Sequence, residues 1–266
     1  MSDIQSAVHS KREGGVALVT GAGTRLGRAV ALFLAGLDYV IAVHYNTSTE
    51  GAASTVREIQ ERGGHAESFP CDFADARNCA GLMQQAGQAL GTITLLVNCA
   101  SAYDQAPIRE TDTELLRREF EANLIAPFQL IRAFADQTNA GMVVNFIDNK
   151  TAFVQPDYAA YLLSKHALAH LTEMAAAELG PGIRVNGIAP GVILPPERRN
   201  EEYIRWRADG IPIGRTGEVA HILSALRFLI ENEFVNGQIL RVDGGESVLR
   251  PGRHAGNYPG HPDRQP

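Results

Sequence analysis

The 266-residue sequence contains only three cysteines, Cys71, Cys79 and Cys99, and none of them forms a C-x-x-C pair. Zinc sites and thiol redox sites usually require that spacing, so we expect no metal site and interpret the cysteines as reduced, mostly buried thiols. No stretch approaches the ~20 apolar residues of a membrane helix, and Met1 to Gly15 has no apolar signal-peptide core. These absences predict a soluble, cytoplasmic protein that contacts no membrane.

Basic residues are the minority among the charged ones: 24 Lys and Arg stand against 30 Asp and Glu, which gives a formal net charge of -6. Nucleic acids and anionic membranes select basic surfaces, so we predict no nucleic-acid partner. The hydrophobic fraction of 45% and the charged fraction of 20% are ordinary for globular proteins. No internal repeat is visible, and the length suits one large α/β domain or two small ones.

Apolar runs alternate with helical patterns along residues 15–249, which is typical of βαβ units. Strands are expected at 16–20, 39–43, 66–70, 93–98, 141–147, 183–189 and 238–243. Helices are expected after the glycine turn at 21–27 and at 50–62, 75–89, 112–136, 158–178, 201–208 and 219–231. In the fourth of these helices, the Thr111-Asp-Thr-Glu114 pattern predicts a capping box at the start. The predicted fold class is α/β: a single doubly wound Rossmann-type domain around a seven-stranded parallel sheet.

Three segments lie outside this regular alternation. Residues 1–14 and 250–266 show no apolar period, and we expect them to be flexible tails. Residues 192–216 contain Pro195, Pro196 and Pro212 and are long for an α/β connection. Long connections in such folds are commonly functional, so this segment is a candidate lid over a substrate.

A glycine-rich turn follows the first expected strand directly and leads into an amphipathic helix: Gly21-Ala-Gly-Thr24-Arg25-Leu26-Gly27. Glycines let the backbone approach a phosphate, and the N–H groups of a helix N-terminus attract an anion. The pattern therefore predicts a phosphate-binding turn, although a tight β-to-α turn without a ligand would have the same sequence.

The second expected strand ends at His44-Tyr45-Asn46-Thr47-Ser48, where dinucleotide-binding folds place the adenosine ribose. NAD enzymes usually have a carboxylate here, whereas these neutral donors tolerate a 2′-phosphate, with cationic Arg25 in the nearby turn. We therefore predict NADP(H) as the preferred cofactor, and the nearby Glu50 keeps NAD(H) open. Asp72, after the third strand, either bonds the adenine amino group or caps the next helix.

Tyr161 and Lys165 are four residues apart, so a helix would place a phenol and an ammonium on the same face. An ammonium near a phenol favours the phenolate and lowers a pKa that starts near ~10, as a general acid/base requires. Asn123 lies among apolar residues within the expected helix at 112–136. A buried amide must be hydrogen-bonded, so Asn123 is a structural bridge, part of a proton relay, or both.

These residues together resemble the short-chain dehydrogenase/reductase family over nearly the whole chain. The match comprises Thr20-Gly21 with Gly27, Asp72, Asn98 with Ala100, Asn123, Tyr161 with Lys165, Pro190-Gly191, and Asp243-Gly-Gly. The resemblance implies that Tyr161 transfers the proton, that Lys165 binds the nicotinamide ribose and lowers the Tyr161 pKa, and that Asn123 holds a relay water. It also implies a cofactor site formed by Gly21, Thr24, Arg25, Leu26, Gly27, His44, Tyr45, Asn46, Thr47, Ser48, Asp72, Phe73, Asn98, Ala100, Lys165, Pro190, Gly191 and Val192.

Three departures from the family pattern resemble its pteridine reductase and dihydromonapterin reductase branch. Arg25 replaces a turn glycine, Asn98-Cys-Ala-Ser101 replaces Asn-Asn-Ala-Gly, and Asp148 replaces the catalytic serine thirteen residues before the tyrosine. In that branch, the residues equivalent to Ser101 and Tyr103 line the pterin site. A carboxylate repels a ketone oxygen unless it is protonated, whereas it can accept from the amino groups of a pterin. The alternative for Asp148 is that it only caps the following turn, and Tyr103 could merely cover the core.

The leading prediction is thus NADPH-dependent hydride transfer to a C=N bond of a pterin-like small molecule. Asp148, Tyr161, Lys165 and Asn123 would be catalytic, and Ser101, Tyr103, Asp148 and Tyr161 would bind the substrate. The alternatives are an NADP(H)-dependent carbonyl or 3-oxoacyl reductase and, from another class, a dinucleotide-sensing protein without turnover. The family resemblance further implies a homodimer or homotetramer that pairs the helices at 112–136 and 158–178.

Overall fold

The computed structural model describes residues 14–194 and 200–249 of the chain. The predicted C-terminal tail and, except for Gly14, the predicted N-terminal tail lie outside the described residues. Residues 195–199, with Pro195 and Pro196 of the candidate lid, also lie outside them.

Seven parallel strands form one sheet in the order β3-β2-β1-β4-β5-β6-β7. The strands are β1 Val16–Val19, β2 Val40–Tyr45, β3 Ala66–Pro70, β4 Ile93–Asn98, β5 Gly141–Phe146, β6 Ile183–Pro190 and β7 Ile239–Val242. The central strands β1 and β4 are almost entirely buried, as expected for a parallel sheet covered on both faces. The predicted fold class, a doubly wound α/β domain with seven parallel strands, is confirmed.

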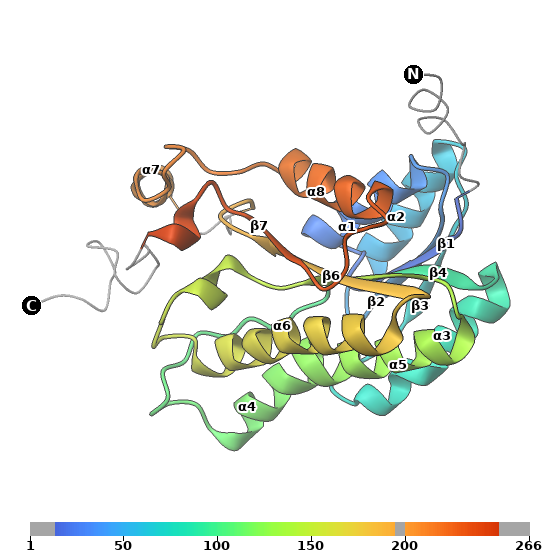
Figure 1. The fold of residues 1–266 in the computed structure, drawn as a ribbon, viewed down its shortest axis with the longest axis horizontal. Helices are drawn as coiled ribbons and strands as arrows, with labels where there is room; N and C mark the ends of the chain where they lie inside the picture. Colours follow the sequence, from blue (N-terminus) through green and yellow to red (C-terminus); the bar gives the residue numbers. More distant parts are fainter. Residues whose placement is uncertain (1–13, 195–199, 250–266) are drawn as a thin grey trace, which may run out of the picture.

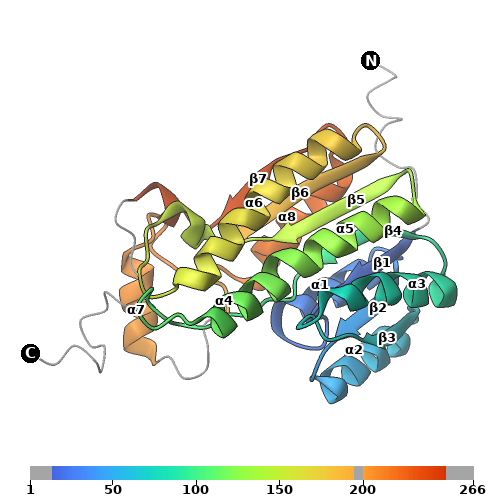
Figure 2. The same ribbon diagram turned by 90° about the horizontal axis from the view of Figure 1, so that it is seen from below.

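Helices cover both faces of the sheet, and each face has its own apolar core (Figure 1). One face carries α1 Arg25–Ala35, α2 Thr49–Glu61 and α8 Val219–Glu231. The opposite face carries α3 Cys79–Leu90, α4 Thr113–Phe120, α5 Ala126–Gln137 and α6 Ala159–Leu179. Figure 2 shows α4, α5 and α6 running along this second face. The short helix α7 Glu201–Asp209 lies apart from both layers, beyond the sheet (Figure 1).

The predicted helix over 112–136 is not continuous. A π-helical segment, η3 Glu121–Ile125, separates α4 from α5 and contains Asn123. Single π-helical turns inside α-helices are frequently found at functional sites. The predicted capping box is also wrong, because Asp112 caps α4 by accepting a hydrogen bond from the N–H of Leu115 at 2.7 Å. The Thr111 hydroxyl is engaged in the preceding turn, where it donates to the carbonyl of Pro107 at 2.9 Å.

Short 3₁₀ turns complete the connections: η2 Ala76–Asn78, η4 Asn149–Ala152 and η5 Glu246–Val248. The last two follow β5 and β7, at the carboxyl edge of the sheet. The direction of the strand order reverses between β1 and β4, and open α/β sheets bind ligands in the crevice at such a switch point.

Candidate active site

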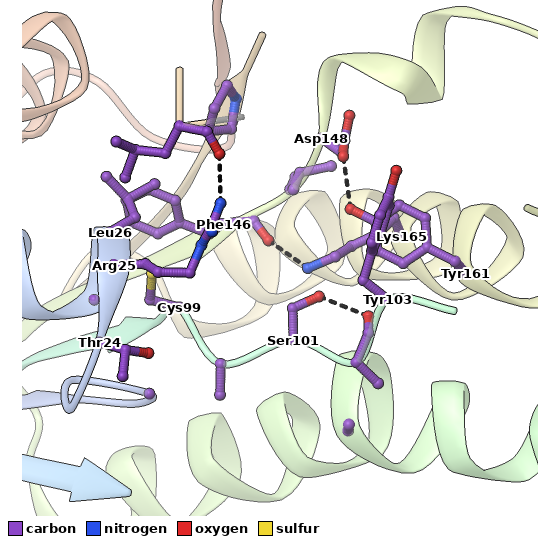
Figure 3. A pocket seen from close by; sticks show the side chains of 18 of the residues that line it. Thr24, Arg25, Leu26, Cys99, Ser101, Tyr103, Phe146, Asp148, Tyr161 and Lys165 are labelled. Atoms are coloured by element: carbon purple, nitrogen blue, oxygen red, sulfur yellow. Dashed lines mark hydrogen bonds between the residues drawn. The ribbon is translucent and has the colours of Figure 1, made fainter. Parts of the chain in front are cut away.

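A cavity of about 890 Å³ opens at the carboxyl edge of the sheet. It is lined by almost all of the residues predicted to bind the cofactor: Gly21, Thr24, Arg25, Leu26, Gly27, His44, Tyr45, Asn46, Thr47, Ser48, Asp72, Phe73, Ala100, Lys165, Pro190, Gly191 and Val192. The predicted substrate residues Ser101, Tyr103, Asp148 and Tyr161 line the same cavity. Figure 3 shows the side chains of Thr24, Arg25 and Leu26 on one side of this space and those of Tyr103, Asp148 and Tyr161 on the other. The sequence therefore predicted which segments meet here.

The glycine turn has the geometry of a phosphate site. Gly21 has a φ of +66°, and a Cβ on Gly27 would lie 2.3 Å from the carbonyl oxygen of Gly21, so only glycine lets α1 pack on the turn. No side chain caps the N-terminus of α1, and its first turn carries no acidic residue. The first N–H groups of a helix have no partner within the helix, so they suit the pyrophosphate of a dinucleotide.

Arg25 holds the turn against the segment that follows β6. Its φ of +48° lies in the left-handed region, which favours glycine. This conformation agrees with the glycine that most members of the resembled family have here. Its guanidinium donates a hydrogen bond to the carbonyl of Leu194, at the start of the candidate lid (Figure 3). The strained residue thus joins the glycine turn to the predicted lid segment.

His44 is a structural partner of the glycine turn. The Gly21 N–H donates to Nδ1 of His44 at 3.1 Å, and Nε2 lies 3.0 Å from the carbonyl of Cys71. These partners require a neutral ring that carries its proton on Nε2. Burial lowers the pKa of His44 to about 4. The imidazole therefore connects β1, β2 and β3 beneath the cofactor site.

Asp72 is held by its own loop and by the segment that follows β2. Its Oδ1 accepts from Nδ2 of Asn46 at 3.0 Å and from the N–H of Ala74 at 2.9 Å. The helix-capping alternative for Asp72 is wrong, because Asp75 caps the following turn by accepting from the N–H of Arg77. Glu50 lies in the first turn of α2 and is not among the residues that line the cavity.

The phenol oxygen of Tyr161 donates a 2.6 Å hydrogen bond to Oδ2 of Asp148 (Figure 3). The Oδ1 atom of the same carboxyl accepts from the N–H of Lys150 at 2.8 Å, so Asp148 also caps η4. Asp148 therefore caps this turn and also contacts the phenol, and its catalytic role stays a prediction. Burial, reinforced by Asp148, raises the pKa of Tyr161 well above its usual value. This direction is opposite to the one expected from Lys165, and it keeps the phenol protonated at neutral pH.

Lys165 is buried beside this pair, on the next turn of α6. Its Nζ donates to the carbonyl of Phe146 at 2.8 Å and lies 5.9 Å from the ring centroid of Tyr161. Burial lowers the pKa of Lys165 to about 8. The ammonium is aimed at the edge of β5 and does not contact the phenol oxygen, which explains why it does not lower the Tyr161 pKa here.

Two predicted residues, Asn98 and Asn123, do not line the cavity. Asn98 donates across the sheet to Oδ1 of Asn145 at 2.8 Å. Asn123 is fully buried: its Oδ1 accepts from the N–H of Ala102, and its Nδ2 lies within 3.0 Å of the carbonyl of Ala102, of Oε2 of Glu119 and of the Ser164 hydroxyl. Its side chain thus forms a structural bridge that fixes the loop carrying Ser101 and Tyr103, and a part for Asn123 in a proton relay stays a prediction.

Aromatic rings form the wall of the cavity next to Tyr161. Tyr103 stacks on Tyr158 with ring centroids 5.0 Å apart, and it meets Tyr161 edge-on with centroids 4.7 Å apart. Burial raises the pKa of Tyr103 to about 12. Tyr103 is still 42% exposed, so it forms part of the surface that a ligand would contact.

Sequence reasoning missed several residues of this wall, namely Arg118, Lys150, Tyr158, Tyr203 and Arg207. Arg207 of α7 forms a buried ion pair with Glu246 of η5 at 2.7 Å, and Glu246 also accepts from Asn149 at 2.8 Å. Nε of Arg207 is buried and has no hydrogen-bond partner among the described residues. Two sequence features could have identified some of these residues. Tyr203 and Arg207 are four residues apart on a short predicted helix and so share a face, and Lys150 is two residues after Asp148.

Comparisons with known proteins agree with the fold. The family described as enoyl-(acyl carrier protein) reductase, a group of short-chain dehydrogenases/reductases, matches residues 21–247. The chain belongs to this family. It is therefore an oxidoreductase, and the resemblance inferred from the motifs is confirmed at the level of the family.

Similar members of the short-chain dehydrogenase/reductase family act on different substrates, according to their names. The solved structure of FolM alternative dihydrofolate reductase 1 from Brucella canis, complexed with NADP, is 32% identical and superimposes with a TM-score of 0.85 over 91% of this chain and 97% of that one. The 3-oxoacyl-[acyl-carrier-protein] reductase FabG of Staphylococcus aureus is 30% identical, over 86% of this chain and 96% of that protein. The 7alpha-hydroxysteroid dehydrogenase of Escherichia coli is 31% identical, over 88% and 94%.

None of the helices among the described residues is long and apolar enough to cross a membrane. The described residues also contain no group of three or more His, Cys, Asp or Glu side chains that could hold a metal ion.

Proposed function

We propose that this protein is an NADPH-dependent reductase that acts on a C=N bond of a pterin-like heterocycle. The observation that carries the proposal is the 2.6 Å hydrogen bond between Tyr161 and Asp148 at the cavity wall. A carboxyl group in this place can accept hydrogen bonds from the amino and ring N–H groups of a pterin. A ketone offers only an oxygen acceptor, so a carboxylate in this place would repel it.

The chain's own groups supply the proton, the orientation and the walls. A bound NADPH would supply the hydride, which adds to the carbon of the C=N bond. Tyr161 would give its proton to the adjacent nitrogen, so that one hydride and one proton saturate the bond. The raised pKa of Tyr161 keeps that proton available, which suits reduction better than oxidation. The exposed ring of Tyr103 would stack on the flat substrate and add roughly 1 kcal/mol beyond the buried area.

The cofactor is NADP(H). The neutral side chains of Asn46, Thr47 and Ser48 line the cavity after β2, where a carboxylate would exclude a 2′-phosphate. Arg25 lines the same end of the cavity and adds a cation. The NADP in the FolM structure from Brucella canis supports the same preference. NAD(H) remains the second choice.

The second candidate function is an NADP(H)-dependent carbonyl or 3-oxoacyl reductase, as the name of the Staphylococcus aureus relative indicates for that protein. One panel of substrates distinguishes these two candidate functions. Purified protein and NADPH are incubated with dihydropterins and, in parallel, with ketones and 3-oxoacyl thioesters, and NADPH oxidation is measured at 340 nm. Turnover of the dihydropterins supports the proposal, and turnover of only the carbonyl compounds eliminates it.

The third candidate, a dinucleotide-sensing protein, is disfavoured because Tyr161 and Lys165 lie together at the cavity wall, and a sensor needs no proton donor. NADPH binding with no oxidation by any compound of the panel, in both the wild type and Tyr161→Phe, would favour the sensor instead.

We also propose that the protein is a homodimer or homotetramer that pairs through α4, α5 and α6. These helices lie side by side on one face of the molecule (Figure 2), and Phe128, Leu163 and Met174 are exposed on them at 49%, 55% and 67%. Apolar side chains gathered on one face are typical of a subunit interface. Light scattering would test this, and a monomer at micromolar concentration would contradict it. A cytoplasmic location stays a prediction.

A further inference from the structure

Lys150 is a cation in the substrate half of the cavity that the proposed chemistry does not use. It belongs to η4, two residues after Asp148, and its side chain is partly buried while it lines the cavity. Lys150 contacts Asp148 through its main-chain N–H and not through its ammonium. Among the described residues, no carboxylate lies within ion-pair distance of its ammonium.

The ammonium of Lys150 is fixed by the aromatic wall. It donates a hydrogen bond to the hydroxyl of Tyr103. Its Nζ lies 4.5 Å from the ring centroid of Tyr103 and 4.9 Å from that of Tyr158. An ammonium has three donors, and this arrangement uses one of them, so two are left for a ligand.

Two other cations of this wall, Arg118 and Arg207, are already paired with carboxylates. Arg118 lines the cavity and pairs with Asp104 at 3.0 Å, and Arg207 pairs with Glu246 at 2.7 Å. Lys165 is buried at the cofactor end and donates to a backbone carbonyl. Among the described residues beside Tyr103, Lys150 is thus the cation without a carboxylate partner that an anion can still reach. A partly desolvated ammonium without a counter-ion gains a charge-assisted hydrogen bond when a carboxylate or phosphate binds.

We propose that Lys150 forms a subsite for an anionic substituent of the substrate, a carboxylate or a phosphate carried by the side chain of the pterin-like ring. This inference rests on the proposed function and adds the chemical class of the side chain to it. The flat ring lies beside Tyr161 and Tyr103, and the side chain extends past the hydroxyl of Tyr103 to the ammonium.

The test uses three substrates that share one ring: dihydrofolate with a carboxylate side chain, dihydroneopterin monophosphate with a phosphate, and dihydrobiopterin with a neutral side chain. The kcat/KM values are measured for the wild type, Lys150→Gln and Lys150→Arg. The matched control is Arg57→Gln, which removes an exposed charge on α2 outside the cavity. Thermal melting and NADPH binding check that each variant is folded.

In Lys150→Gln, the kcat/KM for an anionic substrate relative to the neutral one is expected to fall roughly fivefold to tenfold, the loss expected for a partly exposed charge-assisted contact. Lys150→Arg should retain most of this preference, and Arg57→Gln should retain all of it. The anionic compound whose kcat/KM falls more in Lys150→Gln shows whether the subsite prefers a carboxylate or a phosphate. In the wild type, the KM of the preferred anionic substrate should rise more than that of dihydrobiopterin between about 0.01 M and about 0.15 M salt.

Three results overturn the subsite and leave the proposed function intact. The first is an equal loss for all three compounds in Lys150→Gln, which would mean that Lys150 only supports Tyr103. The second is a preference for the anionic substrates that Lys150→Gln leaves unchanged, and the third is wild-type turnover of the neutral compound alone. If the wild type oxidises NADPH with none of the three compounds, the proposed function fails and the subsite fails with it.

Discussion

Asp148 binds Tyr161 with one carboxyl oxygen and the backbone of η4 with the other: Oδ2 accepts from the Tyr161 hydroxyl at 2.6 Å, and Oδ1 accepts from the N–H of Lys150 at 2.8 Å. The bond from the N–H of Lys150 fixes the orientation of the carboxyl group. The bond from Tyr161 fixes the direction in which the phenol O–H points. The two side chains come from different elements, the end of β5 and the first turn of α6, and they act as one unit.

Removing the phenol oxygen should slow the reaction strongly without loss of the fold. Tyr161→Phe keeps the ring and its edge contact with Tyr103 but removes the proton donor. We expect kcat/KM to fall roughly 100-fold to 10,000-fold, the usual contribution of a positioned acid. NADPH binding, followed by fluorescence, should change little. Tyr158→Phe removes a neighbouring hydroxyl 3.3 Å from Gln105 and is the comparison, with a much smaller loss expected. Equal losses in the two variants would contradict the role of Tyr161.

The low pKa of Lys165 predicts an upper limit to the pH range of activity. The ammonium is present below its pKa of about 8 and is lost as the pH rises through that value. Because the charge would hold the cofactor ribose, kcat/KM for NADPH should be level at neutral pH and fall above about pH 8. Lys165→Arg retains its charge at high pH, so its profile should fall later, from a lower plateau. A fall at the same pH in both proteins would assign the titration to another group.

The buried pair of Arg207 and Glu246 should stabilise the protein and hold α7 over the cavity. Glu246 is 0% exposed and Arg207 is 6% exposed, so Arg207→Met leaves an uncompensated buried carboxylate. The free energy of unfolding, measured with urea, should fall by about 3–5 kcal/mol. The double variant Arg207→Met/Glu246→Leu should recover part of this loss because no buried charge is left. A single variant as stable as the wild type would show that the pair contributes nothing.

His44 should make stability depend on pH in the acid range. Its pKa is lowered from 6.5 to about 4 in the folded chain, so the contribution of the neutral ring is complete above pH 6.5 and is lost as the pH falls through about 4. The shift corresponds to roughly 3 kcal/mol. Urea unfolding between these pH values should show a shallower pH dependence in His44→Gln than in the wild type. Identical slopes would exclude His44 as the source.

The sequence predicted the strands and most of the residues that line the candidate cofactor end of the cavity, because both depend on local patterns. All seven strands lie within two residues of the expected bounds at either end, since buried parallel strands read as short apolar runs between helical patterns. The residues of the glycine turn and of the end of β2 line one cavity because parallel strands deliver their carboxyl ends to the same edge.

The remaining details depend on direction and packing, which a linear pattern does not contain. Asn98 and Asn123 were predicted to belong to the site, but their side chains bond to Asn145 and to the loop at Ala102, and neither residue lines the cavity. The π-helical segment at 121–125 shifts the helix register. The sequence was interpreted as one continuous helix with a 3.6-residue period, so this shift was not predicted. Lys150 and Arg207 belong to the short elements η4 and α7, and whether their side chains reach the cavity depends on how these elements pack.

The measurement that tests the central claim most directly compares the wild type with Asp148→Ser. Serine also caps a turn, so the variant preserves the local fold while it restores the usual residue of the family. The kcat/KM is measured with NADPH for a dihydropterin and for a 3-oxoacyl thioester. We predict that the wild type prefers the dihydropterin and that Asp148→Ser shifts the ratio of the two values at least about tenfold toward the thioester, as expected for loss of a charge-assisted contact. A wild type that reduces only the thioester, or a ratio that Asp148→Ser leaves unchanged, would contradict the account.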